Sequence, residues 1–245
     1  MTRTILFLML LFIQHQVWSQ QSVVDMPFNG DSYDIFKIKI DADVVKKFQI
    51  LENKTRITHQ VFASSVATDS SFFLINASVT DSFCNPVGYF VNNSQQINPV
   101  NLKDGNGNFY LKPNGALLFT STEAIICESS QIANYSNVRV GIQSGPMLIN
   151  NGIINSQFKP ASPNKHIRCA VGIYTNPNNE KFLVFCISNN PVSFFGFADF
   201  MQKKFKCTAA LCLESSNCVM SLPNFETGDG GSNTLICNYI YFKAR

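Results

Sequence analysis

Short apolar runs alternate along this chain with turns built from Asn, Gly, Pro and Ser. Runs of a few residues are typical of buried strands, and the segments between them have the chemistry of tight reversals. Asn150-Asn151-Gly152, placed between two such runs, is a strong hairpin signal. Because no internal repeat or long linker interrupts the pattern, we expect an α+β fold, with a single β-dominated domain of mixed sheets over residues 20–245. The expected strands are Ile35–Ile40, Phe72–Ile75, Val87–Val91, Phe109–Leu111, Ala116–Phe119, Val138–Ile142, Met147–Ile149, Ile153–Ile154, Ile167–Tyr174, Phe182–Ile187, Ala209–Leu213 and Leu235–Tyr241.

Two or three short helices are expected among these strands. Thr58–Ala67 is one of them. The clearest begins after Ser193, which is a suitable N-cap. Its apolar positions fall on one helical face, which predicts a helix packed on the core rather than a ligand-binding surface. These positions are Phe194, Phe197, Ala198, Met201 and Phe205.

The N-terminus has the pattern of a signal peptide. Arg3 precedes an unbroken apolar stretch, Ile5–Ile13, and small residues follow near Ser19. Nine apolar residues are too few to span a bilayer, which needs about 20. We therefore expect residues 1–19 to be removed and the protein to be exported, to the periplasm or the extracellular space. The formal net charge of +3 falls to +2 without Arg3, too weak a balance for a nucleic-acid surface.

Eight cysteines in an exported chain raise the question of disulfides. Several lie inside apolar runs, where a free Cys behaves as a small buried hydrophobe. The sequence leaves open whether the chain forms one or two disulfides or none. A zinc site is disfavoured, because Cys207, Cys212 and Cys218 lack the tight spacing of a zinc knuckle and only His59 and His166 would remain in the mature chain. We assign neither histidine a role.

The segment Ala209–Cys218 carries the most chemical information. An apolar run of strand length stops at Glu214, which is followed by small polar residues. Ligands in folds that combine helices and sheets often lie where strands end and loops begin. A carboxylate at such a place is a candidate for catalysis, although a solvated Glu at a strand end is an equally valid interpretation.

Six short motifs occur in the order found in the phosphodiester glycosidase ("uncovering enzyme") family, and the chain resembles the bacterial exported branch of that family. The resemblance covers about Ile35 to Tyr241 and implies a hydrolase that cleaves the bond between a sugar anomeric carbon and a phosphodiester. The motifs are Leu74–Ala77, Asn85–Gly88, Gly107–Gly115, Gln143–Pro146, Arg168–Gly172, and the aromatic helix that leads into Ala209–Cys218.

The resemblance also implies roles for individual residues. Arg168 is the candidate phosphate clamp, because a planar and permanently charged guanidinium suits a phosphate. Glu214 stands where the family has an Asp, and it would assist an oxocarbenium-like sugar. Asn76 and Asp81 match the family's Asn and the acidic residue that follows it. The candidate substrate-binding residues are Gln143, Ser144, Gly145, Asn114 and Ser216; a structural turn is the alternative for Gln143–Pro146 and for Asn114.

The chain departs from the family pattern at the carboxylate itself. Glu214 replaces Asp, and Ser215-Ser216 replaces glycine, which approaches ligands and adopts positive φ more easily. Two hypotheses therefore stand: an active hydrolase, or a catalytically decayed member that binds glycans or sugar phosphates. Both predict a partner that carries a sugar 1-phosphate diester, with no nucleic acid and no membrane span. No cofactor and no metal ligand are assigned, and metal dependence stays open because carboxylate and amide oxygens can hold a hard cation.

Overall fold

The apolar runs pair into three antiparallel sheets in a computed structural model that describes residues 23–67, 72–231 and 233–243. The seven-stranded sheet has the order β1 (Val24–Phe28), β2 (Asp31–Lys39), β13 (Lys181–Ser188), β12 (Cys169–Thr175), β14 (Ala209–Glu214), β10 (Met147–Asn150), β11 (Ile153–Ile154). One five-stranded sheet has the order β16 (Phe225–Thr227), β15 (Met220–Leu222), β4 (Phe72–Asn76), β17 (Asn238–Lys243), β3 (Phe48–Glu52). The other has the order β6 (Gln95–Asn98), β5 (Phe90–Asn92), β9 (Val140–Ser144), β7 (Gly115–Phe119), β8 (Ala124–Glu128).

The described residues also form three α-helices and two short 3₁₀-helices. The helices are α1 (Ala42–Lys46), α2 (His59–Val66), α3 (Phe194–Phe205), η1 (Asn108–Tyr110) and η2 (Ser129–Asn134). The α+β class expected from the sequence is confirmed. Mixed sheets were expected, whereas every neighbouring strand pair in the described residues is antiparallel.

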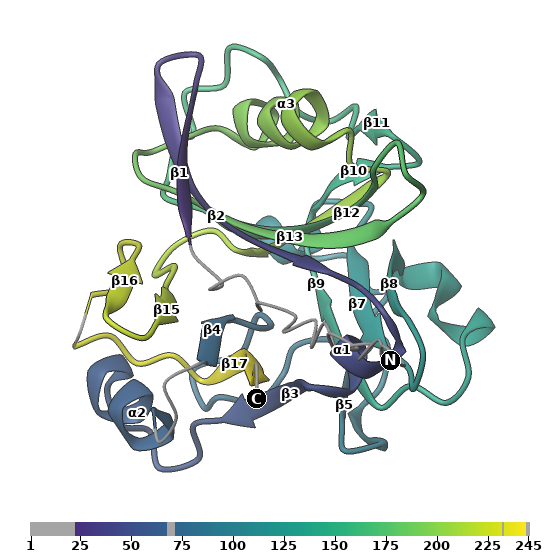
Figure 1. The fold of residues 1–245 in the computed structure, drawn as a ribbon, viewed down its shortest axis with the longest axis vertical. Coiled ribbons are helices and arrows are strands. Elements are labelled where there is room, and N and C mark those ends of the chain that lie inside the picture. Colours follow the sequence, from purple (N-terminus) through teal and green to yellow (C-terminus); the bar gives the residue numbers. More distant parts are fainter. Residues whose placement is uncertain (1–22, 68–71, 232, 244–245) are drawn as a thin grey trace, which may run out of the picture.

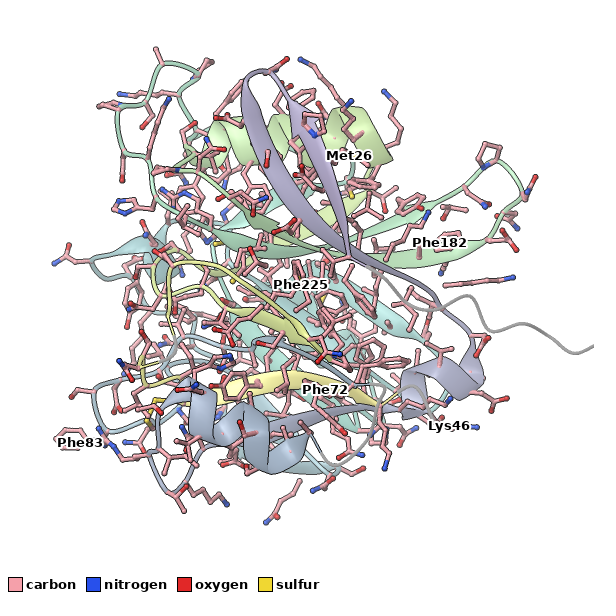
Figure 2. All side chains as sticks on the ribbon, turned by 60° about the vertical axis from the view of Figure 1, so that its left-hand side comes forward. Met26, Lys46, Phe72, Phe83, Phe182 and Phe225 are labelled. Atoms are coloured by element: carbon pink, nitrogen blue, oxygen red, sulfur yellow. A yellow bond between two sulfur atoms is a disulfide. The ribbon has the colours of Figure 1, made fainter. Side chains whose placement is uncertain are left out.

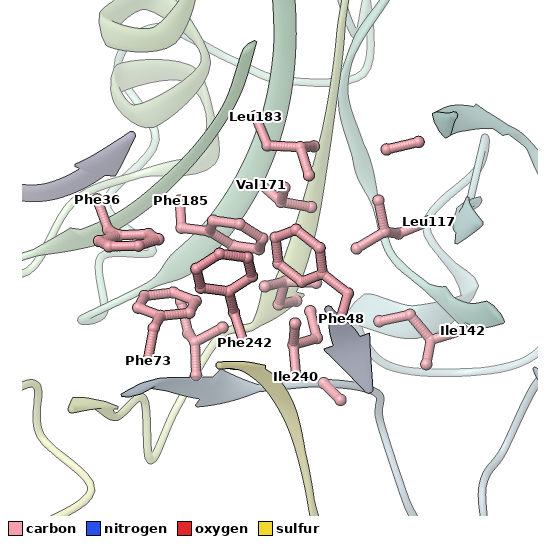
Figure 3. Packing of buried hydrophobic residues seen from close by; sticks show 14 of the residues in the cluster. Phe36, Phe48, Phe73, Leu117, Ile142, Val171, Leu183, Phe185, Ile240 and Phe242 are labelled. Atoms are coloured by element: carbon pink, nitrogen blue, oxygen red, sulfur yellow. The ribbon is translucent and has the colours of Figure 1, made fainter. Parts of the chain in front are cut away.

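The main core lies between the seven-stranded sheet and the two five-stranded sheets (Figure 1). Aromatic side chains from all three sheets meet there: the Phe36 and Phe73 ring centroids are 4.1 Å apart, and those of Phe48 and Phe119 are 4.5 Å apart. Figure 3 shows Phe185 and Phe242 packed among them. Burial of these rings is the largest favourable contribution to joining the sheets, since each aromatic side chain removes a large apolar area from water.

A second core covers the opposite face of the seven-stranded sheet, where α3 packs (Figure 1). Because side chains alternate along a strand, each central strand feeds both cores. In β13, Phe185 faces the main core and Cys186 faces α3. The helix begins as expected, since the Ser193 side chain accepts a hydrogen bond from the Gly196 N–H, and its aromatic face is buried, with Phe197 and Phe200 fully inaccessible.

One disulfide joins Cys84 to Cys237, across 153 residues of sequence, and the other six cysteines are free and buried. The bond ties the loop before β5 to the segment that enters β17. The expected targeting segment at residues 1–19 lies outside the described residues. No helix in the described ranges is long and apolar enough to cross a membrane.

The expected strand at Phe109–Leu111 is wrong. These residues overlap the 3₁₀-helix η1, where the Tyr110 N–H bonds the Gly107 carbonyl at 3.1 Å. Gly107 has φ of 94°, so the chain turns sharply there and cannot continue as an extended strand. The expected terminal strand also begins later than Leu235, because β17 starts at Asn238.

We expect Phe185→Ala to lower the free energy of unfolding by about 3–5 kcal/mol, because the ring is fully buried among three other aromatic side chains and its removal leaves a cavity. Phe182→Ala in the same strand is the matched control. That ring is partly exposed against Tyr174, so the expected loss is about 1 kcal/mol. Urea unfolding of both variants measures the difference, and equal losses would contradict the assignment of Phe185 to the main core.

Candidate functional site

Glu214 lies at the end of β14, where that strand leaves the seven-stranded sheet. The register shifts between β12 and β14 at this point: Ala170 pairs with Cys212, but Cys169 pairs with Glu214. Leu213 is therefore the extra residue of a bulge, a feature that re-aims a strand end. The Ser144 hydroxyl donates to the Leu213 carbonyl at 3.0 Å and satisfies the group that the bulge leaves unpaired.

The Glu214 carboxyl group is partly buried and has no basic partner among the described residues. Burial raises the pKa of Glu214, while hydrogen bonds from the Ser215 and Ser216 N–H groups oppose the rise. The Ser215 N–H lies 2.7 Å from Glu214 Oε1. A carboxyl group in such surroundings changes its protonation state closer to neutral pH than a solvated one, which is a property common among catalytic residues.

The loop after Glu214 keeps a left-handed turn without glycine. The positive φ, 56°, falls on Asn217 and not on Ser215 or Ser216. Asn adopts this region more readily than other residues with a side chain, so the loss of glycine does not prevent the turn. Asn76 at the end of β4 holds the loop in place: its amide donates to the Asn217 carbonyl at 3.2 Å and its Oδ1 accepts from the Val219 N–H at 2.7 Å.

Three thiols surround the Glu214 carbonyl oxygen. Cys212 Sγ is 3.2 Å away, Cys218 Sγ 3.5 Å and Cys169 Sγ 3.9 Å. Burial raises the pKa values of the Cys212 and Cys218 thiols, which therefore stay protonated and donate to this carbonyl. No group of three His, Cys, Asp or Glu side chains in the described ranges is arranged to hold a metal ion.

Arg168 immediately precedes β12 and is fully buried. Its Nε donates to the Val192 carbonyl at 2.9 Å, its Nη2 to the Asn164 carbonyl at 3.3 Å, and its guanidinium carbon lies 3.7 Å from the centre of the Phe194 ring. Nη1 is buried without a hydrogen-bond partner among the described residues. The side chain therefore ties the start of α3 to the 157–164 segment. Its removal would leave a cavity as well as remove a charge.

Three other predicted residues, Gln143, Gly145 and Asn114, contact segments other than the Glu214 loop. Gln143 is fully buried, and its amide bonds the Tyr89 N–H, both backbone groups of Asn101, and the Ser129 hydroxyl. Gly145 approaches so closely that an added Cβ would lie 2.7 Å from Asn114 Cβ. Asn114 is buried and donates to the Phe109 carbonyl at 3.2 Å. Gln143, Gly145 and Asn114 thus make contacts that hold the fold together.

Asp81 and Ser216 are exposed, in contrast to the others. The Asp81 carboxylate accepts hydrogen bonds from the Phe83 and Asn85 N–H groups and from the Asn85 amide, and these lower the pKa of Asp81. The aspartate thus shapes a surface loop, from which Phe83 projects into solvent (Figure 2). The described hydrogen bonds of Asp81 stay within its own loop, whereas Asn76 contacts the Glu214 loop.

A pocket of about 160 Å³ lies beside this loop, at a place that the sequence does not indicate. It is linked to the Glu214 loop by Asn108, whose amide donates to the Ser215 hydroxyl at 2.6 Å. It is linked to Arg168 by Asn164 and Phe194, which the guanidinium contacts. Its walls come from three separate segments: Asn108, Leu111, Gln157, Phe158, Lys159, Ser162, Asn164, Phe194 and Phe195.

Comparison with known proteins decides the family. The family model described as phosphodiester glycosidase matches residues 66–220, more than half of the chain. The chain belongs to the phosphodiester glycosidase family. The matched residues include Asn76, Arg168 and Glu214, so the glycosidase family motifs and the pocket lie within the matched region. Family membership supports a hydrolase-type function.

Individual relatives agree with this assignment. The Escherichia coli K12 protein YigE is 30% identical over 142 residues, which are 58% of this chain and 54% of YigE, so the chain spans about half the length of that relative. The catalytic domain of zebrafish N-acetylglucosamine-1-phosphodiester alpha-N-acetylglucosaminidase, auto-inhibited by its pro-peptide, has the same fold. Its TM-score is 0.59 at 12% identity, with 91% of this chain and 82% of that one covered. A protein from Synechocystis matches with a TM-score of 0.53 at 13% identity over 90% of this chain and 61% of that chain.

Glu214→Gln tests the burial of the carboxyl group. Because burial raises its pKa in the folded state, the folded protein binds this proton more tightly than the unfolded chain. The wild type therefore loses stability as the pH rises from the unfolded pKa through the folded one. The amide does not titrate, so the free energy of unfolding of the variant should rise relative to that of the wild type across this window. Above the folded-state pKa, the difference between the two should no longer change with pH.

Urea unfolding between about pH 4 and pH 8 measures this change. Glu123→Gln, at an exposed position, is the control and should show no comparable trend. A stability difference between Glu214→Gln and the wild type that is the same at every pH would contradict a raised pKa.

Proposed function

We propose that this protein is an exported hydrolase that cleaves the bond between a sugar anomeric carbon and a phosphodiester. The observation that carries the proposal is the Glu214 carboxyl group, which is partly exposed at a strand end, in a loop that Asn108 links to a pocket, in a chain of the phosphodiester glycosidase family. Export is part of the proposal. It is supported by the signal-like pattern around Ile5–Ile13 and by the Cys84–Cys237 disulfide, because disulfides persist in oxidising compartments.

The reaction adds water across the glycosidic bond. The bond from the anomeric carbon to the phosphate oxygen breaks, the sugar gains a hydroxyl group, and the phosphate leaves with the electron pair as a monoester of its remaining substituent. Because the departing phosphate is already anionic and stable, its protonation matters less than stabilisation of the positive charge that develops on the sugar. An ionised Glu214 supplies that stabilisation through its negative charge, as nucleophile, as base for water, or as electrostatic partner.

The supporting residues act through the loop that carries Glu214. Asn76 fixes Asn217 and Val219, Ser144 fixes the bulge at Leu213, and Asn108 fixes Ser215. A carboxylate must be held within about half an ångström of its productive position, and these hydrogen bonds are the means of holding it. We therefore assign Asn76 and Ser144 as positioning residues.

We expect Glu214→Gln to lower kcat/KM at least about a hundredfold, because the amide cannot carry the negative charge. The assay measures the free reducing sugar released from a panel of hexose and N-acetylhexosamine 1-phosphodiesters. In the wild type, kcat/KM should rise with pH through the raised pKa of Glu214, since the ionised form is required. Glu123→Gln should leave turnover unchanged. Full activity of Glu214→Gln would remove the carboxylate from the mechanism.

The second candidate function is binding of a glycan phosphate without turnover. It is favoured by the Ser215-Ser216 pair, whose side chains occupy space next to the carboxylate that glycine would leave open. In that case the same phosphodiesters would raise the melting temperature but release no sugar. Activity that appears only after the double change Glu214→Asp and Ser215→Gly would identify a decayed enzyme.

A further inference from the structure

The pocket beside the Glu214 loop has one sign of charge. Lys159 is the charged residue in its lining, and no carboxylate is among the lining residues. The surrounding sequence has the same bias: no Asp or Glu occurs between Glu128 and Glu180, while this stretch contains Arg139, Lys159, Lys165 and Arg168. A concave site with a cationic lining attracts anions.

Lys159 is available to an anion. Its side chain is exposed, and no ion pair involves it within the described part of the chain. Around it the pocket offers uncharged donors, the Ser162 hydroxyl and the Asn164 amide, whereas the Gln157 amide already donates to the Lys112 carbonyl. The first turn of the twelve-residue helix α3 completes the wall, at the helix end that favours negative charge.

Arg168 is placed behind the wall and not in it. Its guanidinium is fully buried and already donates to two carbonyl groups, so a phosphate cannot reach it without displacement of Phe194 or Asn164. Its buried positive charge lies behind the wall, and its Nη1 has no hydrogen-bond partner among the described residues, so Arg168 still adds to the positive potential that an anion meets in the pocket. The direct charge contact must come from another residue.

We propose that this pocket holds the phosphate of the substrate, that Lys159 is its direct charge partner, and that Arg168 is a positioning residue. The inference rests on the proposed function, since it places the phosphate of the same phosphodiester on the Asn108 side of Glu214. A volume of about 160 Å³ is below the 300–1,000 Å³ typical of pockets that enclose a whole small molecule, so it suits one substituent of the substrate. Leu111 and Phe195, both partly exposed, lie where the organic group beyond the phosphate would contact the protein.

Lys159→Gln is the test, with Lys165→Gln as the matched control, because Lys165 is an exposed lysine of the same segment and outside the lining. Dimethyl phosphate serves as a probe without a sugar, and calorimetry measures its dissociation constant. We expect Lys159→Gln to weaken binding roughly tenfold and Lys165→Gln less than about twofold. In turnover of a sugar 1-phosphodiester, Lys159→Gln should raise KM by a similar factor with little change in kcat, whereas Lys159→Arg should retain most of the affinity.

The outcomes separate this inference from the proposed function. Cleavage of a sugar 1-phosphodiester that is equally efficient in Lys159→Gln and Lys165→Gln would overturn the phosphate site and leave the hydrolase intact. Dimethyl phosphate binding that depends on Lys159, in a protein that cleaves no sugar phosphodiester, would support the site and overturn the hydrolase. Loss of affinity in both lysine variants to the same extent would indicate diffuse attraction and would overturn the direct contact.

Discussion

Both faces of the seven-stranded sheet are buried, one under α3 and the other under the two five-stranded sheets. The central strands β12, β13 and β14 are therefore apolar at successive positions, as in Val184-Phe185-Cys186, and their polar side chains lie at the strand ends. Glu214 and Asn76 occupy such ends. Because the two strands belong to different sheets, the packing that joins the sheets also brings these two residues to the same loop.

The Glu214 loop shows how a glycine-poor sequence preserves a turn. The left-handed conformation falls on Asn217, and Asn76 holds it by donating to the Asn217 carbonyl and accepting from the Val219 N–H. The Ser144–Leu213 contact fixes the preceding bulge from the neighbouring sheet. The shape of the loop thus depends on the assembled sheets more than on the local sequence, so the family motif can change at Ser215 and Ser216 while the carboxyl group still leaves the strand at a supported position.

Much of the fold could be predicted from local patterns. The helix at His59–Val66 lies within the expected Thr58–Ala67, the Ser193 cap is observed, and the Asn150–Asn151–Gly152 turn joins β10 to β11. The failure at Phe109–Leu111 has a local cause, because apolar residues beside a glycine with positive φ form a 3₁₀ turn. The pocket could not be predicted, since its walls come from three segments that meet only in the folded chain. The burial of Arg168 was equally hidden, because sequence does not show that two carbonyl groups and Phe194 already occupy its guanidinium.

The energetics of Glu214 bear on the choice between enzyme and binding protein. Its carboxyl group is partly removed from water, and the hydrogen bonds from Ser215 and Ser216 do not cancel the cost, since the pKa remains raised. A neutral Gln of nearly the same shape would avoid that cost. A position selected only for folding or for neutral hydrogen bonding would gain from such a residue, whereas catalysis at an anomeric carbon requires a charge next to the reacting atom. The presence of an ionisable group at this strand end, in a loop that Asn108 links to a pocket lined by Lys159, therefore favours the hydrolase.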